Sequence, residues 1–351
     1  MPGPRDGRRA VPIPSDRVAW LLATAARAPS VHNTQPWRFA VGEYMVELHS
    51  DPGRRLHSDR GGREMLISCG AVLFGLRLAI RGLGYVPLVD LLPERSQPGL
   101  LARVWLGESI PATAEERRLL AALPHRHTHR GPFSPGQLPD GLLPRLQHDA
   151  RIEGAGLALV ASHGEYQRLA ALVMLARQHG AVDPIARADA RRWSRVADSA
   201  ARDGVPAQAF PAEVAVGPGR LPQRDFDMGR EVGLLSAGGT PALATAALIT
   251  PGDRPADWLR AGQAMHRLLV RAAAVWVFAS LHTQPLEVPA IRAMIRSRLA
   301  LPGEAQLLLQ FGLSASTRPT PRRPASELLA RPRPRPHPRT RGRGPGTADG
   351  R

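Results

Sequence analysis

The sequence predicts an α+β fold. Two segments, 63–83 and 258–276, carry apolar side chains at helical spacing over most of their surface, which is typical of helices in the middle of a molecule. An aromatic, apolar stretch with a glycine turn at Gly42 predicts a β-hairpin over 37–48. With 351 residues, 43% of them apolar, the chain is long enough for one large or two ordinary domains.

The remaining elements follow from short apolar runs, which predict strands, and from apolar residues repeating every three to four positions, which predict helices. Ser15 is a suitable N-cap for the first helix, and the glycines at 82 and 84 end the helix 63–83. In chain order we expect a helix from Ser15 to Pro29, strands at 85–92 and 101–106, a helix at 114–122, a strand at 157–161, helices at 165–179 and around 186–200, a strand at 240–250, a helix at 289–299 and a strand at 306–311.

The composition limits the partners that the protein can have. The formal net charge is +17, and all 47 basic residues are arginines, which indicates a GC-rich genome. Seven arginines lie in the segment 331–351, and no basic stripe with interleaved aromatic residues runs through the rest, so the composition does not favour nucleic-acid binding as the function.

The composition also predicts a location. A single cysteine, Cys69, cannot form an internal disulfide, which agrees with a reducing compartment. No apolar run approaches the length that spans a bilayer, and the segment 1–14 lacks the apolar stretch of a secretion signal. We expect a cytoplasmic protein without a membrane segment.

A polar loop at 28–39 connects the first helix to the hairpin and is the first candidate binding site. Pro29 and Pro36 restrict the backbone on either side, so the loop should be stiff. An ordinary capped turn between a helix and a strand remains an alternative. Four side chains of the loop can hydrogen-bond the edge of a flat heteroaromatic ligand without adding a formal charge: Ser30, His32, Asn33 and Gln35.

The second candidate site is the strip 126–130, in which Arg126, Thr128 and Arg130 alternate with two histidines. On an extended strip these three side chains lie on one side, where two guanidinium groups and a hydroxyl can surround a phosphate. A solvated basic loop is the alternative. The histidines also suggest a metal site, although no carboxylate or cysteine lies close by in the sequence.

Both segments resemble motifs of the nitroreductase superfamily of flavin proteins. The loop 28–39 is similar to its A-P-S-x-x-N-x-Q-P-W segment, and the strip is similar to its R-x-S-x-R-x-F segment, with one extra residue before Phe133. The loop 281–289 resembles the P-x-E segment of that family, and 319–324 resembles its C-terminal basic signature. The chain is most similar to the double-length branch often called the Acg family.

The resemblance implies a non-covalent FMN whose phosphate is held by arginines, with no metal and no catalytic side chain, because the flavin carries the hydride chemistry. The residues it implies in FMN binding are Pro29, Ser30, His32, Asn33, Gln35, Pro36, Trp37, Arg38, Arg126, Thr128, Arg130, Gln284, Pro285, Leu286, Glu287, Pro321, Arg322 and Arg323.

The resemblance also implies a nitroreductase-like fold with two pseudo-symmetric halves, 10–112 and 113–330, that imitate a nitroreductase homodimer within one chain. Each half carries a motif that the other lacks, so we expect one FMN per chain, and a monomer or weak dimer. The irregular insertion at about 182–230 should form a lid, and the Arg- and Pro-rich tail 331–351 should be disordered.

Two functions therefore remain open. One is an FMN-dependent oxidoreductase that uses NAD(P)H to reduce nitro compounds or quinones. The other is an FMN sequestration or storage protein with little reductase activity. The loop 28–39 supports both equally, and an arginine-rich nucleic-acid binder is a third and weaker alternative.

Overall fold

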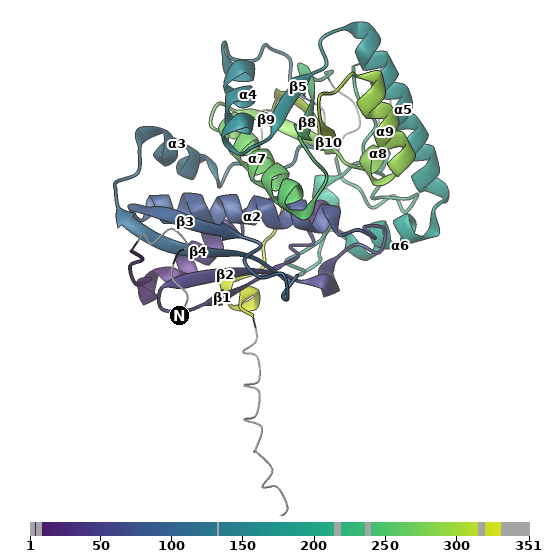
Figure 1. The fold of residues 1–351 in the computed structure, drawn as a ribbon. Coiled ribbons are helices and arrows are strands. Elements are labelled where there is room, and N and C mark those ends of the chain that lie inside the picture. The colour runs from purple at the N-terminus through teal and green to yellow at the C-terminus, as the bar shows by residue number, and fades with distance from the viewer. Residues whose placement is uncertain are drawn as a thin grey trace, which may run out of the picture.

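The computed structural model of the chain describes residues 4, 9–131, 133–213, 219–235, 240–314 and 320–330. It combines two antiparallel sheets with helices (Figure 1), which confirms the predicted α+β class. The tail 331–351, for which we predict disorder, lies outside the described residues.

Each sheet has four strands, and all neighbouring strands in it are antiparallel. The first sheet has the order β1-β2-β4-β3, with β1 (Trp37–Val41), β2 (Met45–Ser50), β3 (Tyr85–Leu91) and β4 (Leu100–Ser109). The second has the order β5-β8-β10-β9, with β5 (Gly156–Leu159), β8 (Ala244–Thr250), β9 (Val277–His282) and β10 (Glu304–Leu313). A parallel pair, β6 (Ser194–Arg195) and β7 (Val205–Pro206), lies in the insertion.

The two sheets have the same strand order when each is numbered along the chain, and a long helix connects the second strand of each to the third. These helices are α2 (Arg63–Gly82) and α7 (Pro255–Ala273). Figure 1 shows them crossing in the middle of the molecule, with the first sheet below α2 and the second above α7.

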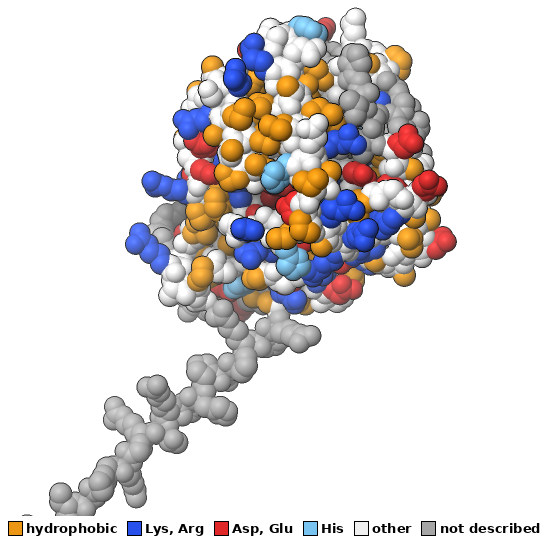
Figure 2. Space-filling model, turned by 90° about the vertical axis from the view of Figure 1, so that its right-hand side faces the viewer, with side chains coloured by type: hydrophobic (Ala, Val, Ile, Leu, Met, Phe, Trp, Pro, Cys, Tyr) orange, Lys and Arg blue, Asp and Glu red, His pale blue; other side chains and the backbone are white. Residues whose placement is uncertain are grey.

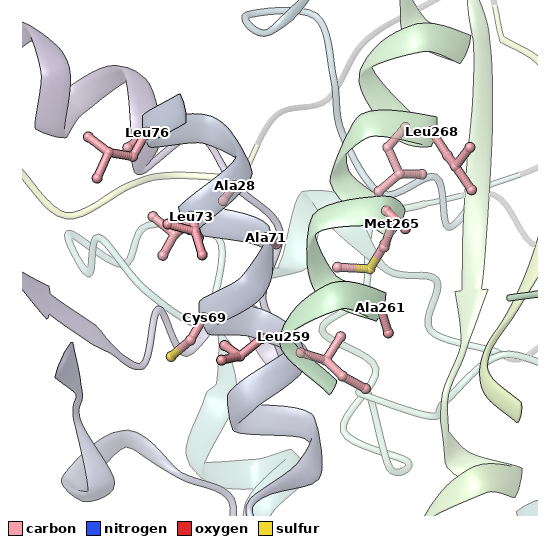
Figure 3. Packing of buried hydrophobic residues seen from close by; sticks show 14 of the residues in the cluster. Ala28, Cys69, Ala71, Leu73, Leu76, Leu259, Ala261, Met265 and Leu268 are labelled. Atoms are coloured by element: carbon pink, nitrogen blue, oxygen red, sulfur yellow. The ribbon is translucent and has the colours of Figure 1, made fainter. Parts of the chain in front are cut away.

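Two glycines allow this crossing. A Cβ at Gly70 would lie 2.2 Å from the carbonyl oxygen of Leu259, and a Cβ at Gly262 would lie 1.9 Å from that of Ile67. The same interval along the chain relates Gly70 to Gly262 and Ile67 to Leu259. Under this internal repeat, the contact of Gly70 with Leu259 is equivalent to the contact of Gly262 with Ile67. Figure 3 shows apolar side chains of both helices beside the crossing, with Cys69 and Met265 among them.

The sequence expectation about membrane segments needs one correction. By length and composition, α2 could cross a membrane, because its most apolar window has a mean hydropathy of 1.6. However, 83% of that window is buried inside the protein, as is typical of a core helix. Cys69 on α2 is fully buried, and burial raises the pKa of its thiol.

The other helices cover the sheets or belong to the insertion. They are α1 (Val18–Ala25), α3 (Ala114–Ala122), α4 (Leu142–Ile152), α5 (His163–Val182), α6 (Pro184–Trp193), α8 (Gln284–Glu287), α9 (Pro289–Arg298) and α10 (Ala325–Leu328), with short 3-10 turns at Ser15–Arg17, Val31–Asn33, Pro52–Arg54 and Ala207–Ala209.

Four sequence predictions about elements are wrong. The helix expected around 186–200 ends at Trp193, and the strand β6 begins at Ser194. Ser15 does not cap the first helix, because a 3-10 turn precedes α1. The predicted helix 258–276 is too long, since α7 ends at Ala273 and Trp276 has a left-handed backbone (φ 57°) immediately before β9, which we did not predict. The helix α4 is also missing from the prediction, although it packs on α7.

The crossing predicts the effect of a glycine substitution. Gly262→Ala should lower the free energy of unfolding by about 1–3 kcal/mol or more, because the new methyl group overlaps a backbone atom that cannot move alone. Gly164→Ala in α5 is the control, since its Cβ would meet only the end of the Arg168 side chain at 3.5 Å. Urea unfolding followed by circular dichroism measures both, and equal stability of the two variants would contradict the close crossing.

Candidate functional site

A cavity lies where the loop after α1, the start of α2 and the end of β9 meet the insertion. Its empty space is about 760 Å³, open solvent at the mouth included. Seven of the residues predicted to bind FMN line it: Pro29, Ser30, His32, Thr128, Arg130, Gln284 and Pro285.

The loop after α1 has a strained backbone that is fixed by hydrogen bonds. His32, Asn33 and Gln35 have left-handed backbones, with φ of 47°, 54° and 50°, which non-glycine residues seldom adopt. The Ser30 hydroxyl accepts from the Gln35 amide at 2.9 Å, and the Ser68 hydroxyl on α2 accepts from the amide of Val31 at 3.1 Å. The loop is therefore held in one conformation against α2.

His32 is buried in this loop, with 4% of its surface exposed, and lines the cavity. Neither ring nitrogen has a hydrogen-bond partner in the described part of the chain, and the ring contacts the edge of Phe226 at a centroid distance of 5.0 Å. Burial, with Arg224 and Arg130 nearby, lowers the pKa of the imidazole well below its ordinary value. The ring is therefore neutral at pH 7 and can hydrogen-bond a ligand in the cavity.

Three arginines form the second part of the site. Arg126 is buried, and Arg130 and Arg322 are half-buried. Arg130 lines the cavity, and the charges of all three lie close enough to interact. Four of their buried nitrogens have no partner among the described residues: Nε and Nη1 of Arg126, Nη1 of Arg130 and Nε of Arg322.

These three arginines have no carboxylate partner in the described part of the chain. Arg126 donates to the Arg27 carbonyl at 3.2 Å, and Arg322 donates to Asn33 Oδ1 at 3.0 Å. Burial lowers the pKa of all three, to about 10 for Arg130 and for Arg322, and the neighbouring arginines lower that of Arg126 further. Arg130 and Arg322 remain charged at neutral pH, so the cluster can bind an anion with several oxygen atoms, such as a phosphate.

The other predicted residues of the first half lie outside the cavity lining. Trp37 is fully buried in the core, and Arg38 on the opposite face of β1 donates to Asp51 at 2.9 Å, because neighbouring strand residues point to opposite faces. Pro36 accepts from the Cys69 thiol. Asn33 Nδ2 donates to the carbonyls of Gly204 and Pro321.

The predicted residues of the C-terminal segment and of α8 also have partners within the protein. Gln35 donates to the Arg202 carbonyl at 2.8 Å and accepts from the amide of Arg323. The Arg323 side chain contacts Glu327, and Leu286 is buried beside α5 and α9. Glu287 pairs with Arg224. These contacts join the first loop, the C-terminal segment and the insertion.

The insertion 182–230 contributes residues that the sequence analysis did not select. Its part from Arg220 onward lines the cavity with Pro222, Gln223, Arg224 and Phe226. The carbonyl of Pro222 accepts from His282 Nδ1 at 3.2 Å. The irregular sequence of this segment gave no periodic signal that could have identified these residues.

Four residues of the central helices also line the cavity without having been predicted. They are Met265 on α7 and Glu64, Ile67 and Ser68 on α2. All have the spacing of ordinary helix residues, so only the crossing identifies their position. Glu64 pairs with Arg63, yet burial and the nearby carboxylates of Glu287 and Asp59 raise the pKa of its carboxyl.

A further set of contacts fixes the insertion to the first half. Asp189 on α6 is fully buried and accepts from the amides of His57 and Ser58, at 3.1 and 2.8 Å, and from the Ser58 hydroxyl at 2.9 Å. Asp203 pairs with Arg54. The insertion is therefore attached to the first half here and to the second half through His282 and Glu287.

The histidines of the strip do not form a metal centre with other ligands. Within the described ranges, no group of three or more His, Cys, Asp or Glu residues could hold a metal ion. The ring of His127 instead contacts Phe278 at 4.4 Å, and that of His129 stacks on Phe133 at 4.5 Å.

The chain is similar to two proteins of Mycobacterium tuberculosis that are provisionally named NAD(P)H nitroreductases. One is 32% identical over 327 residues, which cover 91% of this chain and 92% of the relative. The other, acg, is 26% identical over 322 residues, which cover 90% of this chain and 96% of the relative.

Other comparisons give less. No family model matches the chain. A crystal structure of the FMN-dependent nitroreductase NfnB from Mycobacterium smegmatis, in complex with NADPH, aligns with 62% of this chain and 99% of its own, at a TM-score of 0.37 and 14% identity. The relative that is 32% identical over nearly the whole of both chains confirms the resemblance seen in the sequence. The chain belongs to the nitroreductase family that includes these NAD(P)H nitroreductases and acg.

Proposed function

We propose that the protein binds one FMN per chain in this cavity and uses NAD(P)H to reduce nitro compounds or quinones. The observation that carries the proposal is the group of buried, unpaired donors of Arg126, Arg130 and Arg322 beside the strained loop that contains His32. A buried charge without a partner is costly, so such a cluster is best explained by an anionic ligand. The names of the relatives support the choice of NAD(P)H as reductant.

The residues present fit FMN. Arg126, Arg130 and Arg322 would hold its phosphate, and His32 and Gln284 would supply neutral hydrogen bonds to the ring system. When bound, FMN supplies hydride-transfer chemistry. The chain binds and orients it, and Phe226 and the rest of the insertion exclude water from the cavity.

The internal repeat supports a single site per chain. By the spacing that relates Gly70 to Gly262, the position equivalent to Ser68 is Arg260 on α7. The loop between α1 and β1 corresponds to the connection between α4 and β5, which has only the residues 153–155. A second loop like 28–36 is thus missing, as in a homodimer that has kept one of its two sites.

Three expectations from the sequence remain predictions. They are the two pseudo-symmetric halves, the monomeric or weakly dimeric state and the cytoplasmic location.

One observation favours FMN storage as a second candidate function. The insertion lines the cavity with Phe226, pairs Arg224 with Glu287 and is fixed to the first half through Asp189. A lid attached in this way would keep NAD(P)H from a bound ring as well as keeping FMN in. The balance between the two functions then depends on how often the insertion opens.

The first consequence of the proposal is the cofactor content. Purified protein should be yellow and release one FMN per chain on denaturation, as measured by absorbance and chromatography of the released flavin. A colourless protein that FMN does not reconstitute, or a content of two per chain, would contradict the proposal.

The arginine cluster predicts a difference between FMN and riboflavin. Arg126→Ala, Arg130→Ala or Arg322→Ala should weaken FMN binding by about one to two decades, because a hydrogen bond to a charged group contributes about 1.5–3 kcal/mol. Riboflavin, which lacks the phosphate, should be affected much less. Titration of flavin fluorescence measures both, with Arg118→Ala on the exposed side of α3 as the control. An equal loss for both ligands would assign these arginines to the fold or the ring.

The position of Phe226 in the cavity predicts how fast NADH or NADPH reduces the bound flavin. Phe226→Ala should open the cavity, so that NADH or NADPH bleaches the flavin faster under anaerobic conditions and FMN dissociates more readily. Leu234→Ala, an exposed position of the same region, is the control. Rapid bleaching of the unaltered protein would favour the oxidoreductase over storage, and identical rates in all three proteins would remove the lid from the explanation.

A further inference from the structure

A second cavity adjoins the first on the side of α5 and α6. Its empty space is about 950 Å³, open solvent included, and it lies between these two helices and the residues 224–228 of the insertion. Arg224 and Gln284 line both cavities, so the two spaces adjoin at these side chains. We call this second cavity the annex.

The annex carries positive charge with free hydrogen-bond donors. Three arginines line it, Arg177 on α5, Arg187 on α6 and Arg224, against one acidic residue, Asp225. Asp225 Oδ1 accepts from the amide of Met228 at 2.7 Å, so this carboxylate is partly engaged in its own turn. Figure 2 faces the side of the molecule where α5 and α6 lie, and arginine side chains gather on the lower part of this face.

Two of these arginines are available to a ligand. In the described residues Arg177 makes no hydrogen bond and no ion pair. Arg187 uses Nη1 to donate to the carbonyl of Ala181 at 3.1 Å, and its other nitrogens have no partner in the same residues. Arg224 is paired with Glu287 at the boundary between the two cavities.

We propose that the annex binds the phosphate end of the reduced dinucleotide and selects NADPH over NADH. This inference rests on the proposed function, which puts the nicotinamide of the same molecule in the first cavity. A dinucleotide has its reacting nicotinamide at one end, its bridging pyrophosphate in the middle and its adenosine at the other end, so two adjoining cavities can take the two ends. NADPH differs from NADH only by a phosphate on the adenosine ribose, and the forked guanidinium groups of Arg177 and Arg187 match a phosphate.

Binding of a dinucleotide fragment tests the annex without any redox step. Adenosine 2′,5′-bisphosphate carries the extra phosphate of NADPH but no nicotinamide, and adenosine 5′-monophosphate lacks that phosphate. Calorimetric titration of the FMN-loaded protein should show tighter binding of the bisphosphate. Arg177→Gln and Arg187→Gln should each weaken it about tenfold or more, and should change binding of the monophosphate little. Arg168→Gln, an exposed arginine of α5 outside the annex, should leave both unchanged.

The same variants then separate the annex from the flavin site. In stopped-flow reduction they should raise the NADPH concentration for half-maximal bleaching by a similar factor, with little effect for NADH and an unchanged FMN content. Equal affinities of the unaltered protein for the two nucleotides, or equal losses for both in the variants, would overturn the annex while leaving the flavin proposal intact. A protein that FMN does not reconstitute, but that still discriminates between the two nucleotides, would retain the annex and contradict the flavin proposal. Circular dichroism confirms that each variant is folded.

Discussion

The close crossing of α2 and α7 is the constraint on which the rest of the structure depends. At Gly70 and Gly262 each helix touches the backbone of the other, and no side chain fits between them. This contact fixes the distance between the two sheets and brings Glu64 and Ser68 of α2 to the same cavity as Met265 of α7. Ser68 holds the amide of Val31 against α2, and Asn33 of the same loop donates to the carbonyls of Gly204 and Pro321 in the second half.

The distribution of charge distinguishes the candidate site from the rest of the molecule. Elsewhere a buried arginine has a carboxylate partner, as Arg271 does in Asp149 at 2.6 Å. Beside the cavity, Arg126, Arg130 and Arg322 have none in the described residues, and the repulsion and desolvation lower the pKa of their guanidinium groups. A protein that keeps such a cluster loses stability in the absence of an anion, and an anionic ligand that neutralises the cluster restores it.

The insertion lines both cavities, and how often it opens decides between the two candidate functions. It supplies Phe226 to the first cavity, Arg187 to the annex and Arg224 to both. Its buried anchor, Asp189, accepts hydrogen bonds from the loop that follows the first sheet's hairpin.

The sequence by itself determined the α+β class, both long helices, the family, and the segments 28–36 and 126–130, because periodicity and turn residues act locally and a fixed motif can be read without a fold. It did not determine which of those residues face the cavity. Trp37 and Arg38 belong to a strand whose pleat turns them to the core and to Asp51, while Glu64, Met265, Arg224 and Phe226 reach the cavity only through the helix crossing and the folding of an insertion without periodicity. The unpaired state of the arginines is likewise a tertiary property, since the sequence lists charges but only the packed chain decides which of them lie beside a carboxylate.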